Sequence, residues 1–249
     1  MKQLTKYINN LFFVQNAPTV FEKAYIDINK SKSYREYCKE LHQFDFPCWN
    51  TLSITQKSFL ETQLSKLKIN SLLDIGSGNG EITKYLCHKY NCKGTGIDFA
   101  QSPSDSKKVK FIKTEFLKKK LEEKYSVIIS IDSFYMINNY KKYLKKIMNL
   151  LESNGTVIII FSLTMDSFEN SKINKALNKL NLNYSITDFT QDDLAFWTKS
   201  EQLLDQYNDK FVDEGKFNLW NIKKKETDKN IQLHNSNNIS RLALVINKG

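Results

Sequence analysis

A glycine-rich loop and a carboxylate downstream of it are the residues whose types and spacing could do chemistry. Asp74 is followed by Gly76, Gly78 and Gly80, and Asp98 lies about twenty residues beyond the loop. Glycine has no Cβ, so the loop backbone can pass close to a ligand. An acid at this distance can accept hydrogen bonds from ribose hydroxyl groups. The pattern therefore predicts a site for a ligand that carries a nucleoside.

Two apolar strands and a helix must position these residues. We predict a buried strand over residues 72–75, a helix over 81–87 with an apolar face, and a second strand over 94–97. A strand–loop–helix–strand unit places the loop and the following acid at the carboxyl edge of a parallel sheet. The predicted elements and the candidate residues therefore agree on one location.

The glycine spacing argues against a dinucleotide ligand. The dinucleotide fingerprint is Gly-x-Gly-x-x-Gly, whereas the third glycine here, Gly80, comes one residue early and Glu81 takes the fingerprint position. The Glu81 carboxylate would also lie unfavourably close to a pyrophosphate. An oxidoreductase is therefore the least favoured enzyme class.

The stretch resembles motif I of class I S-adenosylmethionine-dependent methyltransferases, whose pattern is acid-x-Gly-x-Gly-x-Gly. Asp74, Gly76, Gly78 and Gly80 match it position for position. The resemblance implies an α/β fold with a Rossmann-like, doubly wound, seven-stranded sheet whose last strand is antiparallel. It implies S-adenosylmethionine, which has no phosphate, as the cofactor. The strong part of the resemblance covers residues 70–162.

The resemblance also implies which residues contact the cofactor. They come from the loop, the strand ends and the N-terminal segment: Asp74, Gly76, Ser77, Gly78, Gly80, Asp98, Phe99, Glu115, Phe116, Asp132 and Tyr37. Glu115 stands where many family members have an Asp that binds the adenine amino group, and an acid at a helix start explains it equally well. Phe116 could pack against the adenine ring.

Methyl transfer from a sulfonium mainly needs alignment and exclusion of water, but a hydroxyl or carbon acceptor also needs a base. The candidate bases are His42, Asp132, Tyr135, Tyr25 and Tyr37. Of these, Asp132 and Tyr135 follow an apolar strand whose end faces the crevice. His42 is a lone histidine, and such residues more often serve packing than catalysis. We list His42, Asp132 and Tyr135 as the catalytic candidates.

The sequence pattern predicts two domains, with the boundary at residue 68. Residues 1–68 predict a helical N-terminal cap, or substrate lid, with helices over 34–41 and 55–67. Residues 69–249 predict the Rossmann-like methyltransferase domain, and residues 227–240 read as a polar loop within it.

The sequence also predicts a helix, a turn and two further strands in the second half of the chain. A helix over residues 141–151 is expected to end with Gly155 as its turn residue, and apolar strands follow over 156–162 and 241–246. The closing strand begins with Arg241.

Charge and composition narrow the partners. The net charge is +10, but Arg35 and Arg241 are the only arginines in the 249 residues. Proteins that read bases and phosphates favour arginine for its bidentate fork, so a nucleic-acid substrate is disfavoured and a small-molecule acceptor is expected. A tRNA or rRNA methyltransferase and a non-catalytic partner protein remain the alternatives.

No apolar run approaches the roughly 20 residues of a membrane span, and the apolar run 11–14 is too short for a signal peptide. We therefore expect no membrane, a cytoplasmic location and a monomer or homodimer. Cys38, Cys48, Cys87 and Cys92 lack a metal-binding spacing, which predicts reduced thiols and no metal.

Overall fold

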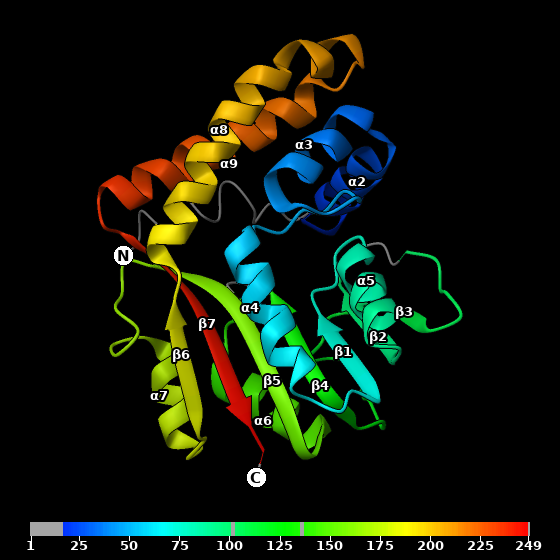
Figure 1. The fold of residues 1–249 in the computed structure, drawn as a ribbon. Helices are drawn as coiled ribbons and strands as arrows, with labels where there is room; N and C mark the ends of the chain where they lie inside the picture. Colours follow the sequence, from blue (N-terminus) through cyan, green and yellow to red (C-terminus); the bar gives the residue numbers. More distant parts are fainter. Residues whose placement is uncertain (1–16, 101–102, 135–136, 249) are drawn as a thin grey trace.

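The computed structural model describes residues 17–100, 103–134 and 137–248, and Figure 1 shows a sheet with helices on both faces and a helical layer above it. Tyr135, one of the expected catalytic residues, lies outside the described residues. Among those residues, no helix combines the length and apolar character needed to cross a membrane.

The sheet has the order β3-β2-β1-β4-β5-β7-β6, with β7 antiparallel to both of its neighbours. This confirms the predicted seven-stranded, doubly wound sheet with its last strand antiparallel. Its strands are β1 (Ser71–Ile75), β2 (Lys93–Asp98), β3 (Val109–Lys113), β4 (Tyr125–Ile131), β5 (Leu151–Thr164), β6 (Tyr184–Asp188) and β7 (Ile239–Asn247). The strand order reverses between β1 and β4, the place where such sheets bind ligands.

Two hydrophobic cores lie on the two faces of the sheet. Alternate residues of each strand point to opposite faces, so Leu72 and Val127 belong to one core while Leu73 and Ile128 belong to the other. Helices α4 (Ile54–Ser65) and α5 (Glu81–Lys89) cover the first face, and α6 (Tyr140–Leu150) and α7 (Lys172–Lys179) cover the second. Every residue of β4 is buried, which explains its uninterrupted apolar run.

A layer of four helices lies above the carboxyl ends of the parallel strands (Figure 1). It consists of α2 (Ala17–Lys30), α3 (Lys32–His42), α8 (Thr190–Asp213) and α9 (Phe217–Asn235). We call these four helices the cap. The expected cap of residues 1–68 supplies α2 and α3, whereas α4 covers the sheet and α8 and α9 complete the cap from the far end of the chain.

Charge and hydrogen bonds join the two parts of the cap. The Glu214 carboxylate, directly after α8, accepts hydrogen bonds from Ser31 Oγ at 2.8 Å and from the Lys32 and Ser33 amides at 2.6 and 3.0 Å. A carboxylate at a helix N-terminus is favourable because the helix dipole is positive there. Glu214 therefore fixes the start of α3 against the end of α8.

Two local expectations are wrong. Asn154, with φ of 62°, takes the left-handed conformation expected of Gly155. Both residues lie in β5, and a Cβ on Gly155 would lie 2.7 Å from Leu151 Cγ. The expected loop 227–240 is helical as far as Asn235. The helix persists because Thr227 and His234 are buried and form hydrogen bonds to Ser200 and Asp193 of α8.

Candidate active site

A cavity of about 1750 Å³ lies between the cap and the carboxyl edge of the sheet. Its walls come from the loop after β1, the ends of β2 to β5, and helices α2, α8 and α9. We call this cavity the cleft. It lies at the point where the strand order reverses, as the sequence pattern predicts.

Four backbone amides of the glycine loop already donate hydrogen bonds within the protein. The Gly76 and Ser77 amides donate to the Ile97 carbonyl oxygen at 2.7 and 3.1 Å. The Gly78 amide donates to Asp98 Oδ2 at 2.9 Å, and the Gly80 amide donates to the Ser77 carbonyl oxygen at 2.9 Å. A loop that binds phosphate presents such amides to its ligand. These four are already used, which favours a ligand without phosphate.

Two of the glycines are required by close contacts. A Cβ on Gly76, whose φ is 84°, would lie 2.2 Å from Ser133 Cβ, so glycine lets the loop approach the end of β4. A Cβ on Gly80 would lie 2.6 Å from the Phe111 ring. Gly80, expected among the cofactor contacts, therefore packs against β3 and lies outside the lining of the cleft. Gly76 and Gly78 do line it.

Asp98 is a buried acceptor at the cleft wall. Its side chain is 5% exposed, and Oδ1 accepts from the Ala100 amide at 2.8 Å while Oδ2 accepts from the Gly78 amide. Burial raises the pKa of Asp98, and the amide hydrogen bonds offset part of that rise. Each carboxylate oxygen has a second lone pair, so the side chain can still accept from a pair of hydroxyl groups.

Asp74 and Ser77 complete this wall. Asp74 is buried and accepts from Thr83 Oγ1 at 2.6 Å, which ties β1 to α5. Burial, with a contribution from the charge of Asp98, raises the pKa of Asp74 to about 7. Ser77 Oγ is buried and has no hydrogen-bond partner within the described part of the chain. An unpaired buried hydroxyl is costly, so a polar ligand group would satisfy it.

Phe99, Phe116 and Glu115, all expected to contact the cofactor, line the same cleft. Phe99 packs edge-on against Phe21 of α2 with ring centroids 5.4 Å apart. Phe116 packs in the same way against Tyr143 at 5.1 Å. Glu115 is exposed at the rim and forms an ion pair with Lys118.

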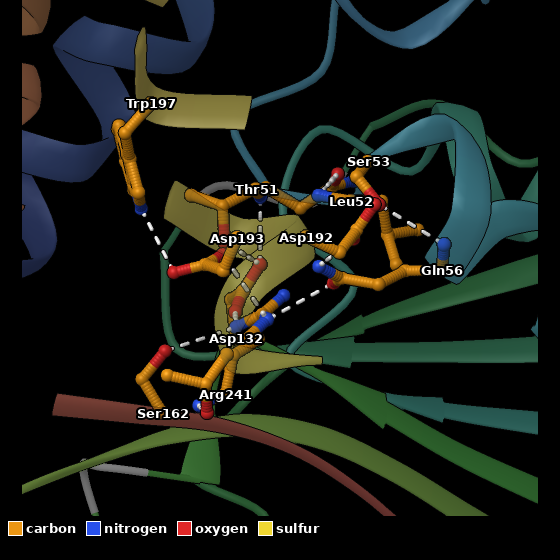
Figure 2. Close-up of polar contacts among 12 residues, drawn as sticks. Thr51, Leu52, Ser53, Gln56, Asp132, Ser162, Asp192, Asp193, Trp197 and Arg241 are labelled. Carbon is orange, nitrogen blue, oxygen red and sulfur yellow. Dashed lines mark hydrogen bonds and ion pairs between the residues drawn. The ribbon is translucent and has the colours of Figure 1, made fainter. Parts of the chain in front are cut away.

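Asp132 lies on the opposite wall, where β4 ends, and its surroundings are drawn in Figure 2. Its Oδ1 contacts Nη1 of Arg241, a fully buried residue of β7. Its Oδ2 accepts from the Thr51 amide at 2.7 Å and from Thr51 Oγ1 at 3.0 Å. Burial alone would raise the pKa of Asp132, but the Arg241 guanidinium holds it below its usual value. An ionised and fully paired carboxylate is a poor proton acceptor, which corrects the expected role of Asp132 as a base.

The Arg241 side chain continues into a buried network. Its Nε donates to Gln56 Oε1 at 3.0 Å and lies 3.7 Å from Asp193 Oδ1 (Figure 2). Asp193 Oδ2 in turn pairs with Trp197 Nε1 at 3.0 Å and with His234 Nε2 at 2.9 Å. The network therefore joins the sheet to α4, α8 and α9. Sequence reasoning did not single out Arg241, although a rare arginine at the head of an apolar strand was a usable signal.

Two expected site residues lie elsewhere. Tyr37 is fully buried, and its hydroxyl shares a 2.7 Å hydrogen bond with Ser200 of α8. His42 is buried with its Nδ1 2.7 Å from the Leu52 carbonyl oxygen. Both lie outside the lining of the cleft because their face of α3 packs against the core of the cap. Tyr25 of α2, by contrast, lies 3.5 Å from the position of a Gly78 Cβ and lines the cleft.

A family model described as a methyltransferase domain matches residues 32–223, more than half of the chain. Among similar sequences, a protein named putative methyltransferase 235L of Invertebrate iridescent virus 6 is 25% identical over 201 residues, covering 70% of each chain. The malonyl-[acyl-carrier protein] O-methyltransferase of Bacillus cereus is 30% identical over 113 residues, which is 42% of this chain and 41% of that relative.

Solved structures share the fold at low sequence identity. A Haemonchus contortus phosphoethanolamine N-methyltransferase, determined with S-adenosylhomocysteine and phosphomonomethylethanolamine, superposes with a TM-score of 0.72 at 14% identity. That superposition covers 93% of this chain and 61% of the other. A cyclopropane synthase from Mycobacterium tuberculosis superposes with a TM-score of 0.68 at 11% identity, over 90% of this chain and 98% of the other.

Proposed function

Because this chain belongs to the class I S-adenosylmethionine-dependent methyltransferases, we propose that it methylates a small molecule held in the cleft beneath the cap. The observation that carries the proposal is the position of the cleft. It lies between the glycine loop on one side and the helical cap, which lines it with both apolar and charged side chains, on the other. A cavity covered in this way suits an acceptor small enough to enter beneath the helices.

The loop wall fits the cofactor. Gly76 and Gly78 let the loop backbone approach the cofactor closely. Asp98 offers hydrogen-bond acceptors for the two ribose hydroxyls, and the unpaired Ser77 hydroxyl offers a further polar contact. We propose that Tyr25 contacts the amino-acid end of the cofactor, in place of Tyr37. We keep Glu115 and Phe116 as the adenine contacts and Phe99 as a further cofactor contact.

The cap wall supplies apolar surface for the acceptor. The cap residues Trp197, Leu219, Ile222 and Leu233 line the cleft on this side, together with Trp49 of the loop between α3 and α4. Apolar area removed from water contributes about 25 cal/mol per Å², so an acceptor with an apolar body gains from this wall. Asp132 and Thr51 supply polar groups at its inner edge.

The bound cofactor supplies an electrophilic methyl group on a sulfonium. The residues of this chain bind the acceptor, align it with that group and exclude water. Asp132 is held as an ion pair, and burial raises the pKa values of the cleft residues Tyr140 and Tyr143. We therefore propose an acceptor that does not need Asp132, Tyr140 or Tyr143 as a base, such as a carboxylate or an amine.

The test measures formation of S-adenosylhomocysteine by the purified full chain with carboxylate, amine and phenol acceptors that carry apolar groups. We expect turnover with a carboxylate or an amine, and a large loss of turnover at limiting cofactor concentration in the Asp98→Ala variant. Methylation of tRNA or rRNA without turnover of any small acceptor would overturn the acceptor class. Cofactor binding without turnover of any acceptor, RNA included, would support the non-catalytic alternative.

A further inference from the structure

Two cysteines and a histidine that are not regularly spaced in the sequence meet in the cap core. Cys38 and His42 are four residues apart on α3, so they share one face of the helix. Cys48 returns to that face from the loop between α3 and α4. One ligand atom from each of the three residues lies within 4.8 Å of the other two. Their exposures are 0%, 2% and 1% for Cys38, His42 and Cys48.

The histidine is oriented as metal-binding histidines are. His42 Nδ1 lies 2.7 Å from the Leu52 carbonyl oxygen, and a carbonyl oxygen can only accept, so Nδ1 carries the hydrogen. In the neutral ring, Nε2 then holds the free lone pair. Metal-ligating histidines commonly donate their other ring N–H to a backbone carbonyl, which fixes the tautomer and the ring orientation.

We infer that Cys38, His42 and Cys48 bind one Zn²⁺ ion in the core of the cap. Sulfur and imidazole ligands favour zinc over magnesium or calcium, which prefer oxygen. Two thiolates balance the charge of the ion, so the buried centre is neutral overall. Zinc is usually four-coordinate, which leaves one position for a water molecule. On binding, the two thiols release their protons to solvent.

The position of the cluster indicates a bracing role. It fastens α3 to residues 43–53, the segment that ends in the α4 N-terminus. That segment carries Thr51, whose amide and hydroxyl bind Asp132 at the cleft. Zinc at this site would therefore fix the position of the cap relative to Asp132 and Thr51 at the cleft. This inference does not depend on the proposed acceptor.

The test measures zinc bound per chain after the full-length protein is equilibrated with zinc and freed of excess ion. We expect about one ion per chain in the natural sequence and a loss of at least tenfold in Cys38→Ser and in Cys48→Ser. Cys87→Ser is the matched control. Cys87 is equally buried, and within the described residues it belongs to no such three-ligand cluster, so this variant should keep its zinc.

A second measurement needs no variant to fold. Cobalt added to the natural protein in place of zinc should give thiolate-to-cobalt charge-transfer absorption, which zinc then displaces. Absence of bound zinc and of that absorption in the reduced protein would overturn the site. A protein in which peptide mapping finds a Cys38–Cys48 disulfide, and which takes up no zinc after reduction, would show a redox pair instead of a metal centre.

Discussion

The two walls of the cleft differ in how far apart in the sequence their parts lie. On the loop wall, Gly78 and Asp98 are 20 positions apart. We call the wall opposite the loop, around Asp132, the acceptor wall. There Asp132 pairs with Arg241 of β7, which is 109 positions away in the sequence. The first wall is one continuous supersecondary unit, so a local pattern describes it. The second is assembled by the fold, which leaves the acceptor free to vary while the cofactor site stays the same.

The walls also treat buried charge in opposite ways. Asp74 and Asp98 lie on the loop wall with hydrogen-bond donors, and among the described residues no cation pairs with either. Burial raises the pKa of each. Asp132 has Arg241 as its partner, which lowers its pKa. The loop wall should therefore gain stability in acid, and the acceptor wall should lose it.

The largest effect is expected from Arg241→Met, which leaves the buried Asp193 and the partly buried Asp132 without their cation. Removing one member of a buried ion pair typically costs about 3–5 kcal/mol. Denaturant unfolding should show that loss, while calorimetry on the folded fraction should show nearly unchanged cofactor affinity. Adding Asp132→Asn should recover part of the stability, since Asn tolerates the φ of 54° at this position. A large loss of cofactor affinity in the single variant would contradict the separation of the walls.

A second prediction uses the pKa of Asp74, which rises from 3.8 unfolded to about 7 in the fold. A group with a raised pKa stabilises the fold fully below pH 3.8, and that contribution is lost as the pH rises to about 7. Asp74→Asn keeps an acceptor for Thr83 but has no charge to bury. At pH 8 it should be more stable than the natural protein by an amount on the order of 4 kcal/mol, and at pH 4 nearly equal. A difference that does not change with pH would be the contrary result.

Asp98→Ala should weaken S-adenosylmethionine binding about 100-fold, because it removes charge-assisted hydrogen bonds worth about 3 kcal/mol together. Isothermal calorimetry measures the affinity, and circular dichroism checks that the fold is retained. Asp166→Ala, an exposed carboxylate at the far end of the cleft, is the control and should bind the cofactor normally. Natural affinity in Asp98→Ala would remove the ribose assignment.

The smallest effect is expected from Ile222→Ala on α9. Ile222 is 49% exposed and lines the cleft, so truncation should cost about 1 kcal/mol of acceptor binding and little stability. Steady-state kinetics should show KM for the acceptor rising several-fold, with KM for the cofactor unchanged. Val212→Ala is the control, because Val212 is 50% exposed and lies outside the lining. Equal effects from both variants would argue against a contact between α9 of the cap and the acceptor.

Sequence reasoning predicted the parts of the molecule that depend on local pattern. The position of the glycine loop is confirmed, as are the seven-stranded, doubly wound sheet and its antiparallel last strand, which the resemblance implied. Side-chain periodicity also predicted the helix that carries Tyr37, which the resemblance implied as a cofactor contact. It could not say that Tyr37 meets Ser200 of α8 instead of the cleft, since that contact spans 163 positions.

Three other features were hidden for the same reason. Gly80 matches the motif, yet its role is to admit the Phe111 ring from a neighbouring strand. The partnership of Asp132 with Arg241 depends on the insertion of β7 beside β5. The grouping of Cys38 with Cys48 depends on the path of a loop without regular structure. Each requires knowledge of which distant segments become neighbours.

The clamp of Glu214 on the first turn of α3 has a consequence for how the protein is made. Ser31 and Glu214 are separated by 183 positions, so nearly all of the intervening chain must leave the ribosome before this contact can form. The nucleoside pocket uses residues that emerge together and can assemble sooner. Loop-closure entropy penalises contacts between distant segments. We therefore expect nascent chains to bind cofactor before they can hold an acceptor.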